Sequence, residues 1–238
     1  MESGMHSMIL IPAGWFWMGS DHHYEWERPR HRVWLDAFEI ARCPVTRREY
    51  AVFLRETGHS EPAGWHDPNF NDDEQPVVGV NWFSAASYCE WLSKSQGKTF
   101  RLPTEAEWEK ACRGELDAAE YAWGDQPPGE IDYFQGEWKS PKPVGKWRPN
   151  GYGLSNIGDN VHEWCIDWYA ADYYASSPER NPTGPENGTR RVSRGGSWRH
   201  QIKASRAAHR SSLPPEYQYT DYGFRIVGVI RGQTSKSP

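Results

Sequence analysis

The sequence lacks the features of membrane-spanning and nucleic-acid-binding proteins. No apolar run approaches the ~20 residues that a transmembrane helix needs, and Met1–Ser7 holds no basic segment that would open a signal peptide. Positive charge is in deficit, because 27 Lys and Arg face 32 Asp and Glu, for a formal net charge of −5. Phosphate contacts need clustered Lys and Arg. We therefore expect neither a membrane nor a nucleic acid as a partner.

Cysteine is scarce and dispersed. Cys43, Cys89, Cys112 and Cys165 lie far apart, and none forms a C-x-x-C motif. A disulfide framework is disfavoured when no signal peptide is recognisable. We expect reduced, buried thiols and a cytoplasmic location.

Hydrophobic residues are also few, at 37% of the chain, but many of them are large. There are 14 Trp, 12 Tyr and 8 Phe, together with 22 Gly and 18 Pro. This composition predicts a Trp-rich core with much turn and loop around it, and it excludes a helical bundle. A length of 238 residues suits one large domain or two small ones.

Three helices are predicted in the first half of the chain from their end signals. A Thr three residues before a Glu forms a capping box, an Asn can cap an N-terminus, and a Gly ends the last turn. The expected helices, with the N-cap and the terminating glycine of each, are residues 47–56 (Thr46, Gly58), 82–94 (Asn81, Gly97) and 105–112 (Thr104, Gly114).

Short apolar or alternating segments predict strands in the rest of the chain. The expected strands are residues 8–12, 15–18, 32–37, 161–164, 191–195 and 224–229. Residues 59–77 are rich in Pro and Gly and predict a long loop. Helices confined to one half and short strands elsewhere indicate an α+β fold rather than βαβ winding.

Several motifs, taken in order along the chain, resemble the formylglycine-generating enzyme (sulfatase-modifying factor) family. The motifs that carry the resemblance are Arg42–Thr46, Arg101–Glu109, Asn150–Leu154, Gly158–Trp164, Arg194–Trp198 and Gly223–Arg225, and the resemblance spans about residues 9–230. It implies one compact domain of variant C-type-lectin-like fold, low in regular secondary structure. We expect that domain over residues 1–232 and a polar tail at 233–238.

The chemistry of that family's copper enzymes is missing here. Their Cu(I) is held by two cysteines, spaced Cys-x4-Cys, shortly after the Gly-Gly-Ser-aromatic turn, and soft thiolates are what Cu(I) prefers. The matching stretch, Arg199–Ser211, contains no cysteine. Neither bound copper nor copper-dependent formylglycine generation is therefore expected, and no residue is assigned a catalytic role.

The sequence suggests two other metal sites. His200 and His209 lie in the same stretch, with Asp221 after them, and imidazole suits Fe, Cu, Zn and Ni; the alternative is that both are surface or hydrogen-bonded histidines. The resemblance also implies a calcium loop with ligands Asn150, Gly151, Gly153 and Ser155. Oxygen ligands on a Gly-rich turn suit Ca²⁺, although a tight turn without metal has the same sequence.

The same resemblance places the ligand face of the fold at about residues 198–222. Aromatic and Arg side chains dominate binding hot spots, and the candidate ligand-binding residues are Trp198, Arg199, His200, Lys203, His209, Tyr217 and Tyr219. Arg206, Arg210 and Arg225 are expected instead to form buried salt bridges within the fold.

Three functions remain open from the sequence. The first is a module that binds a peptide, protein or small-molecule ligand. The second is a metal-dependent oxidoreductase, which would oxidise a thiol or related substrate with oxygen at a site without cysteine. The third is a ligand-display protein diversified by a retroelement, although Lys203, Glu216 and Gln218 are not typical products of adenine-directed mutagenesis.

Overall fold

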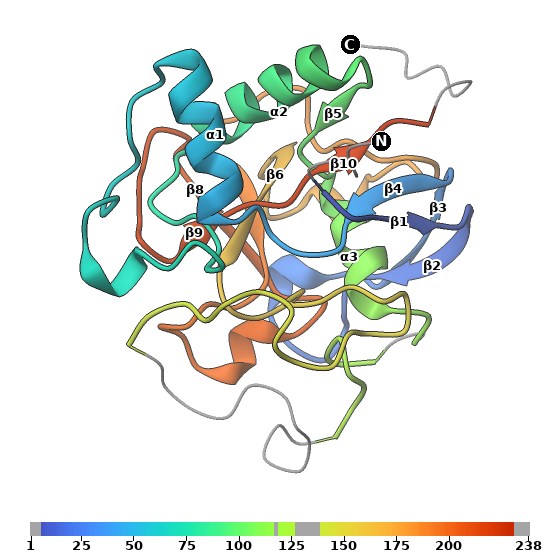
Figure 1. Ribbon diagram of the computed structural model, residues 1–238. Helices are drawn as coiled ribbons and strands as arrows, with labels where there is room; N and C mark the ends of the chain where they lie inside the picture. The colour runs from blue at the N-terminus through green and yellow to red at the C-terminus, as the bar shows by residue number, and fades with distance from the viewer. Residues whose placement is uncertain (1–5, 117–118, 127–138, 231–238) are drawn as a thin grey trace.

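The computed structural model describes residues 6–116, 119–126 and 139–230, so the tail expected at 233–238 lies outside the described residues. Long loops connect its elements (Figure 1). The helices are α1 (Arg47–Thr57), α2 (Trp82–Gln96) and α3 (Glu105–Arg113). The strands are β1 (Met8–Ile11), β2 (Gly14–Met18), β3 (His31–Leu35), β4 (Phe38–Ala41), β5 (Phe100–Arg101), β6 (His162–Trp168), β7 (Arg191–Arg194), β8 (Arg210–Leu213), β9 (Tyr222–Gly223) and β10 (Val227–Gly228).

The helices begin at the predicted residues and end one or two residues beyond the predicted ends. Thr46 and Thr104 each accept a hydrogen bond from the backbone of the Glu three residues on, and each Glu side chain accepts one in return. The Asn81 side chain caps α2 in the same way, without the reciprocal bond. Each helix is followed by a glycine in the left-handed region, which closes the last turn at no steric cost.

The strands form three sheets, of order β1-β4-β10-β5, β2-β3 and β8-β7-β6-β9. Two of the predicted strands are longer than the strands that the structure shows. The strand expected at 32–37 ends at Leu35, because the chain leaves the β2–β3 hairpin there and enters another sheet only at Phe38, beyond the predicted range. Of the strand expected at 224–229, only β10 (Val227–Gly228) forms, and it pairs with β4 and β5; β9, which pairs with β6, ends just before the predicted range.

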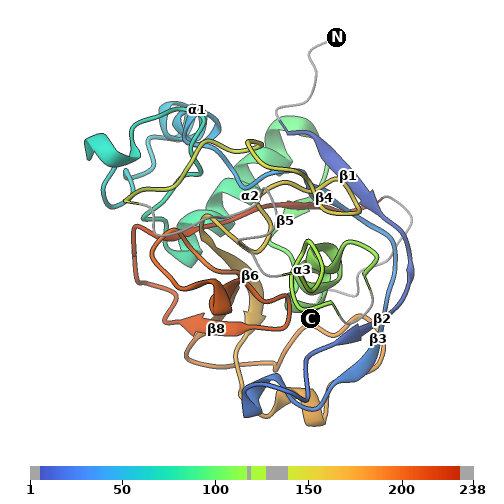
Figure 2. The ribbon, with the colours of Figure 1, turned by 90° about the horizontal axis from the view of Figure 1, so that it is seen from below.

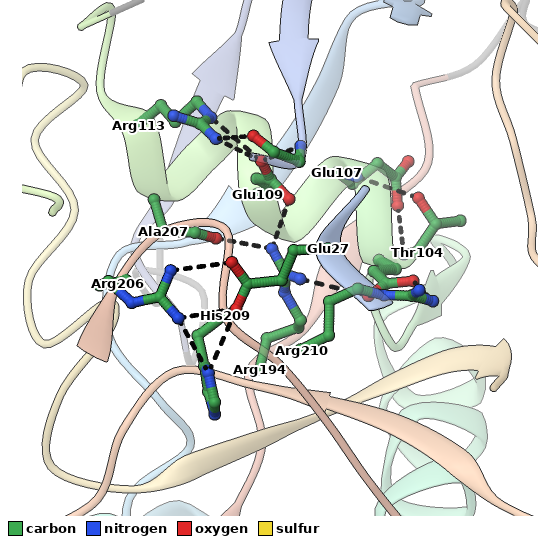
Figure 3. A network of polar contacts seen from close by, with 12 residues as sticks. Glu27, Thr104, Glu107, Glu109, Arg113, Arg194, Arg206, Ala207, His209 and Arg210 are labelled. Atoms are coloured by element: carbon green, nitrogen blue, oxygen red, sulfur yellow. Dashed lines mark hydrogen bonds and ion pairs between the residues drawn. The ribbon is translucent and has the colours of Figure 1, made fainter. Parts of the chain in front are cut away.

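Helix α3 lies in the interior, with β1 and β4 on one side and β6 on another (Figure 2). Its buried carboxylates face buried arginines from the C-terminal half (Figure 3). Arg194 contacts Glu105 and Glu109 at 3.2 and 2.5 Å, and Arg210 binds Glu105 through two nitrogens. Buried, charge-assisted pairs of this kind favour one arrangement of the segments that carry them. In any other arrangement a buried charge would lack its partner, and that costs free energy.

The predicted burial of three arginines is confirmed. Arg206 binds Glu27, Arg210 binds Glu105 and Arg225 binds Glu163, and all three guanidinium groups are buried. These arginines therefore hold the fold together and are not available to a ligand.

The four cysteines are free, and three of them are buried. Burial raises the pKa of the Cys112 thiol to about 12 and that of Cys165 well above its usual value, so neither offers a thiolate at neutral pH. In the described part of the chain, no helix has the length and apolar character needed to cross a bilayer.

Candidate functional site

Two histidines and one carboxylate meet at one end of the β8-β7-β6-β9 sheet. Ligand atoms of His162, His200 and Asp221 all lie within 4.8 Å of one another. His162 and Asp221 are buried, whereas the His200 side chain is 48% exposed. The cluster therefore has a rigid inner part and one side open to solvent.

Strand pairing brings the inner pair together. β6 begins at His162 and runs parallel to β9, with His162 opposite Tyr222. The backbone N–H of His162 donates to the Asp221 carbonyl at 2.9 Å. Segments distant in the sequence are thus fixed side by side by main-chain hydrogen bonds.

The turn after β7 delivers His200. Gly195 has φ +80°, and a side chain on Gly196 would lie 2.4 Å from the Ser205 Oγ, so both positions need glycine. The chain then closes a turn in which the N–H of His200 donates to the Ser197 carbonyl at 3.0 Å. The Gly-Gly-Ser-Trp motif therefore acts by letting the backbone pass closely enough to place Ser197 and His200 beside His162.

Hydrogen bonds fix which ring nitrogen of His162 carries the proton. Its Nδ1 lies 2.5 Å from the Gly195 carbonyl, which can only accept, so Nδ1 is the donor. The unprotonated Nε2 then faces His200 Nδ1 at 2.7 Å. Ser197 Oγ donates to Asp221 Oδ2 at 3.0 Å and lies 3.1 Å from His200 Nδ1.

The electrostatics keep the inner histidine neutral. Burial lowers the pKa of His162 to about 4, although the Asp221 carboxylate acts in the opposite direction. At pH 7 the cluster therefore presents an unprotonated imidazole nitrogen beside a carboxylate. Arg199 Nη1 lies 3.7 Å from Asp221 Oδ1, at the exposed side of the cluster.

Aromatic rings extend from the cluster to the surface. The Tyr222 ring lies 4.8 Å from that of His162, Tyr219 lies 6.2 Å from Tyr222, and Tyr217 lies 5.9 Å from Tyr219. Tyr217 and Tyr219 are 45% and 48% exposed. Trp198 is half-buried against Phe70, and its Nε1 donates to the Thr220 carbonyl. We call Trp198, Arg199, His200, Tyr217 and Tyr219 the aromatic surface.

The other two predicted ligand-binding residues lie differently. Lys203 is exposed, and its carbonyl accepts a hydrogen bond from Arg206. His209 is partly buried and contacts Glu27 and Arg206, as Figure 3 shows. The structure groups His200 with His162 and Asp221 rather than with His209, because His209 contacts the buried Glu27 carboxylate of the structural network.

The sequence did not single out His162. Its motif, His162-Glu163-Trp164, lacks the spacing of a local zinc motif, and its partner His200 is 38 residues away. The sequence analysis did name Asp221 after His200 and His209, but no spacing along the chain related it to His162. The pairing of β6 with β9 brings Asp221 beside His162, and local spacing in the sequence does not encode that pairing.

The calcium residues form a tight turn. Asn150 Oδ1 accepts from the N–H groups of Tyr152 and Leu154, and its Nδ2 donates to the carbonyls of Ala111 and Cys112. The turn presses so closely on α3 that a side chain at Gly151 would lie 2.0 Å from the Gly114 carbonyl. Asn150 is therefore saturated in this conformation and does not fit a calcium ligand without rearrangement. Calcium at Asn150, Gly151, Gly153 and Ser155 stays a prediction.

A cleft of about 380 Å³ is lined by a different set of residues, including Arg42, Cys43 and Arg48. Four of its titratable members are already paired, since His6 binds Glu49 and Arg48 binds Glu74. Burial raises the pKa of Cys43, which disfavours a thiolate there. The chemistry of the described chain is therefore better supported at the histidine cluster than in this cleft.

Comparison with known proteins gives a consistent result. The sulfatase-modifying factor enzyme 1-like domain matches residues 2–230. The formylglycine-generating enzyme of Streptomyces coelicolor is 34% identical over 91% of this chain and 87% of that protein. The serine/threonine-protein kinase pkn1 of Chlamydia pneumoniae is 34% identical over 94% of this chain, which spans only 38% of that protein. Among solved structures, Treponema denticola variable protein 1 has a TM-score of 0.82 and 26% identity, and the match covers 94% and 95% of the two chains.

Proposed function

This chain belongs to the sulfatase-modifying factor enzyme 1-like family, as its motifs predicted, and we propose that it uses the family fold to bind a peptide or small-molecule ligand. The observation that carries the proposal is the aromatic surface around the half-exposed His200. Arg199 and His200 of this surface lie in the stretch Arg199–Ser211, which matches the segment where the family's copper enzymes have their cysteines, and this chain has none there.

The aromatic surface has the properties of a binding site rather than of ordinary exposed surface. Tyr217 and Tyr219 hold large rings in solvent, and the Arg199 guanidinium lies over the Trp198 ring; these residue types dominate recognition hot spots. The backbone beneath them is anchored, because the Tyr219 carbonyl accepts from Gly79 and Trp82 donates to the Pro215 carbonyl. An anchored backbone reduces the entropy lost when a ligand binds.

Two relatives support a binding role. The match to pkn1 accounts for 38% of a protein named as a kinase, so in that relative the region is one part of a larger chain. The structural match to a protein named as variable supports a surface that tolerates sequence change, which is the premise of the diversified-display alternative. Neither relative identifies a ligand.

A metal-dependent oxidoreductase is the second candidate, and one observation favours it. Two imidazoles and a carboxylate converge at His162, His200 and Asp221, and such a set suits non-haem Fe(II). The copper chemistry of formylglycine generation does not fit these residues, because no thiolate lies among them. Oxidation here would require a redox metal and dioxygen at a histidine site.

The test is selection from a displayed random-peptide library and a fragment library against the purified protein. Tyr217→Ser with Tyr219→Ser removes the exposed rings, and Trp15→Ala on β2 is the matched control, since Trp15 is 45% exposed on a different sheet. We expect ligands that bind wild type and the control at least tenfold better than the double variant. Ligands that bind all three proteins equally would contradict the proposal, and so would a selection that enriches nothing.

A further inference from the structure

We infer that His162 Nε2, His200 Nδ1 and Asp221 Oδ2 together bind one divalent first-row transition-metal ion. The inference goes beyond ligand binding and does not depend on it. Imidazole and carboxylate donors together suit Zn²⁺, Fe²⁺ and Co²⁺, whereas Cu(I) favours the thiolates that are missing here.

The donor atoms are close to the spacing that one ion needs. Donors bound at ~2.1 Å and separated by angles of ~90–109° lie ~3.0–3.4 Å apart. His162 Nε2 and His200 Nδ1 are 2.7 Å apart, and His200 Nδ1 and Asp221 Oδ2 are 3.9 Å apart. The ligand atoms of His162 and Asp221 lie within 4.8 Å of each other and have to approach by up to ~1.8 Å. The His162–His200 pair has to open and the His200–Asp221 pair has to close by well under ~1 Å. The half-exposed His200 ring has room for that movement.

Neighbouring hydrogen-bonding groups hold the three ligand side chains in orientation, as they do in known metal sites. The Gly195 carbonyl accepts a hydrogen bond from the Nδ1–H of His162, which leaves Nε2 unprotonated with its lone pair directed at His200. Ser197 donates to the same Asp221 oxygen that would bind the ion. Outer hydrogen bonds of this kind set the tautomer and the orientation of the ligands.

Backbone pairing makes the site pre-organised. His162 and Asp221 are 2% and 3% exposed, and the parallel pairing of β6 with β9 joins their main chains. His200 comes from the bend after β7, and Asp221 lies in the turn directly before β9. The main chains that carry two of the three ligands are therefore already fixed side by side before an ion binds.

Three protein ligands leave at least one coordination position open, as catalytic and ligand-binding metal sites do and closed structural sites do not. The exposed member of the set, His200, belongs to the aromatic surface, so the open position lies next to the proposed binding surface. A ligand with a carboxylate or another oxygen donor could then bind the ion while its apolar part lies on Tyr217 and Tyr219.

The experiment uses the full chain after removal of metal with a chelator. Co²⁺ is added as a spectroscopic probe, and Zn²⁺ is titrated by competition. We expect one ion per chain after gel filtration, with visible Co²⁺ bands of a nitrogen- and oxygen-liganded site. The His200→Ala variant should bind more than ~100-fold more weakly, because losing even an outer partner costs ~10–100-fold.

The control is His66→Ala, since His66 is an exposed histidine beside Glu61 and should not affect binding. His200 is exposed, so its replacement should leave the protein folded, and circular dichroism checks this. Equal binding by wild type and His200→Ala, or less than half an ion per chain, would overturn the inference and leave a hydrogen-bonded cluster only. Peptide binding that persists in EDTA would support the proposed function while the metal inference is judged separately by the Co²⁺ result.

Discussion

Arg225 and Glu163 form a bidentate ion pair at the centre of the molecule, with Nε–Oε2 and Nη2–Oε1 distances of 2.6 and 2.8 Å. Both side chains are fully buried, and Trp108 donates to the same carboxylate at 2.7 Å. Glu163 follows His162 on β6, and Arg225 lies between β9 and β10. The pair therefore joins the sheet that carries the site to the sheet that β10 enters.

Removing one member of this pair should destabilise the fold strongly. Arg225→Met leaves Glu163 buried and unpaired, and breaking such a pair costs about 3–5 kcal/mol. We expect that loss in the free energy of unfolding, measured with urea at pH 7. Exposed Arg180→Met, which breaks a pair with Asp36 at the surface, is the control and should cost less than ~1 kcal/mol. Equal losses in the two variants would refute the special role of the buried pair.

His162 should make stability depend on pH. Its folded-state pKa is lowered to about 4, below the unfolded value of ~6.5, so the unfolded state binds more protons between these values. Its contribution to stability is therefore complete above pH ~6.5 and is lost as the pH falls to about 4, by up to ~3 kcal/mol. His200 and Asp221 face the same ring. The measurement is the wild-type minus His162→Gln difference in unfolding free energy across that range, and a flat difference would contradict the assignment.

The contribution of Asp167 to stability should depend on pH in the opposite direction to that of His162. Burial, with the nearby Glu105 carboxylate, raises its pKa to about 8, and it accepts a hydrogen bond from the Glu105 backbone. Protonated Asp167 is favoured in the fold, so its contribution is present below pH ~4 and is lost as the pH rises toward 8. Asp167→Asn keeps an acceptor and cannot ionise. The variant should be more stable than wild type at pH 8 by on the order of 2 kcal/mol or more and similar at pH 4.

Ser197 should act as a positioning residue for the metal site. It holds Asp221 through a 3.0 Å hydrogen bond and does not itself belong to the proposed ligand set. Ser197→Ala should weaken Co²⁺ binding ~10-fold and shift the visible Co²⁺ spectrum, with little change in unfolding free energy. Ser95→Ala on α2 is the control. A Ser197→Ala protein that binds Co²⁺ like wild type would show that the hydroxyl has no such role.

Calcium is tested separately at the 150–155 turn. The Asn150 amide already makes hydrogen bonds that join this turn to the end of α3. Asn150→Ala should therefore lower Tm in EGTA as well as in Ca²⁺, because those bonds are lost in both. If calcium binds as the family resemblance implies, Ca²⁺ should raise the wild-type Tm and should not raise that of the variant. No Ca²⁺ effect on wild type would count against a calcium site.

Local signals in the sequence determined much of this protein. Thr46, Asn81 and Thr104 with the glycines that follow set all three helices, because capping depends on residues only a few positions apart. Ordered motifs identified the family. The pattern around Arg206 and Arg225 also predicted their buried ion pairs correctly.

The tertiary structure decided which residues form the candidate site. His162, His200 and Asp221 come from the start of β6, the turn after β7 and the residue before β9, and no spacing along the chain relates them. His209 was an equally good partner for His200 in the sequence, but the buried Glu27 binds it elsewhere. Capping is local and can be read from neighbouring residues. The convergence of side chains depends on strand pairing between distant segments, which the sequence pattern alone does not specify.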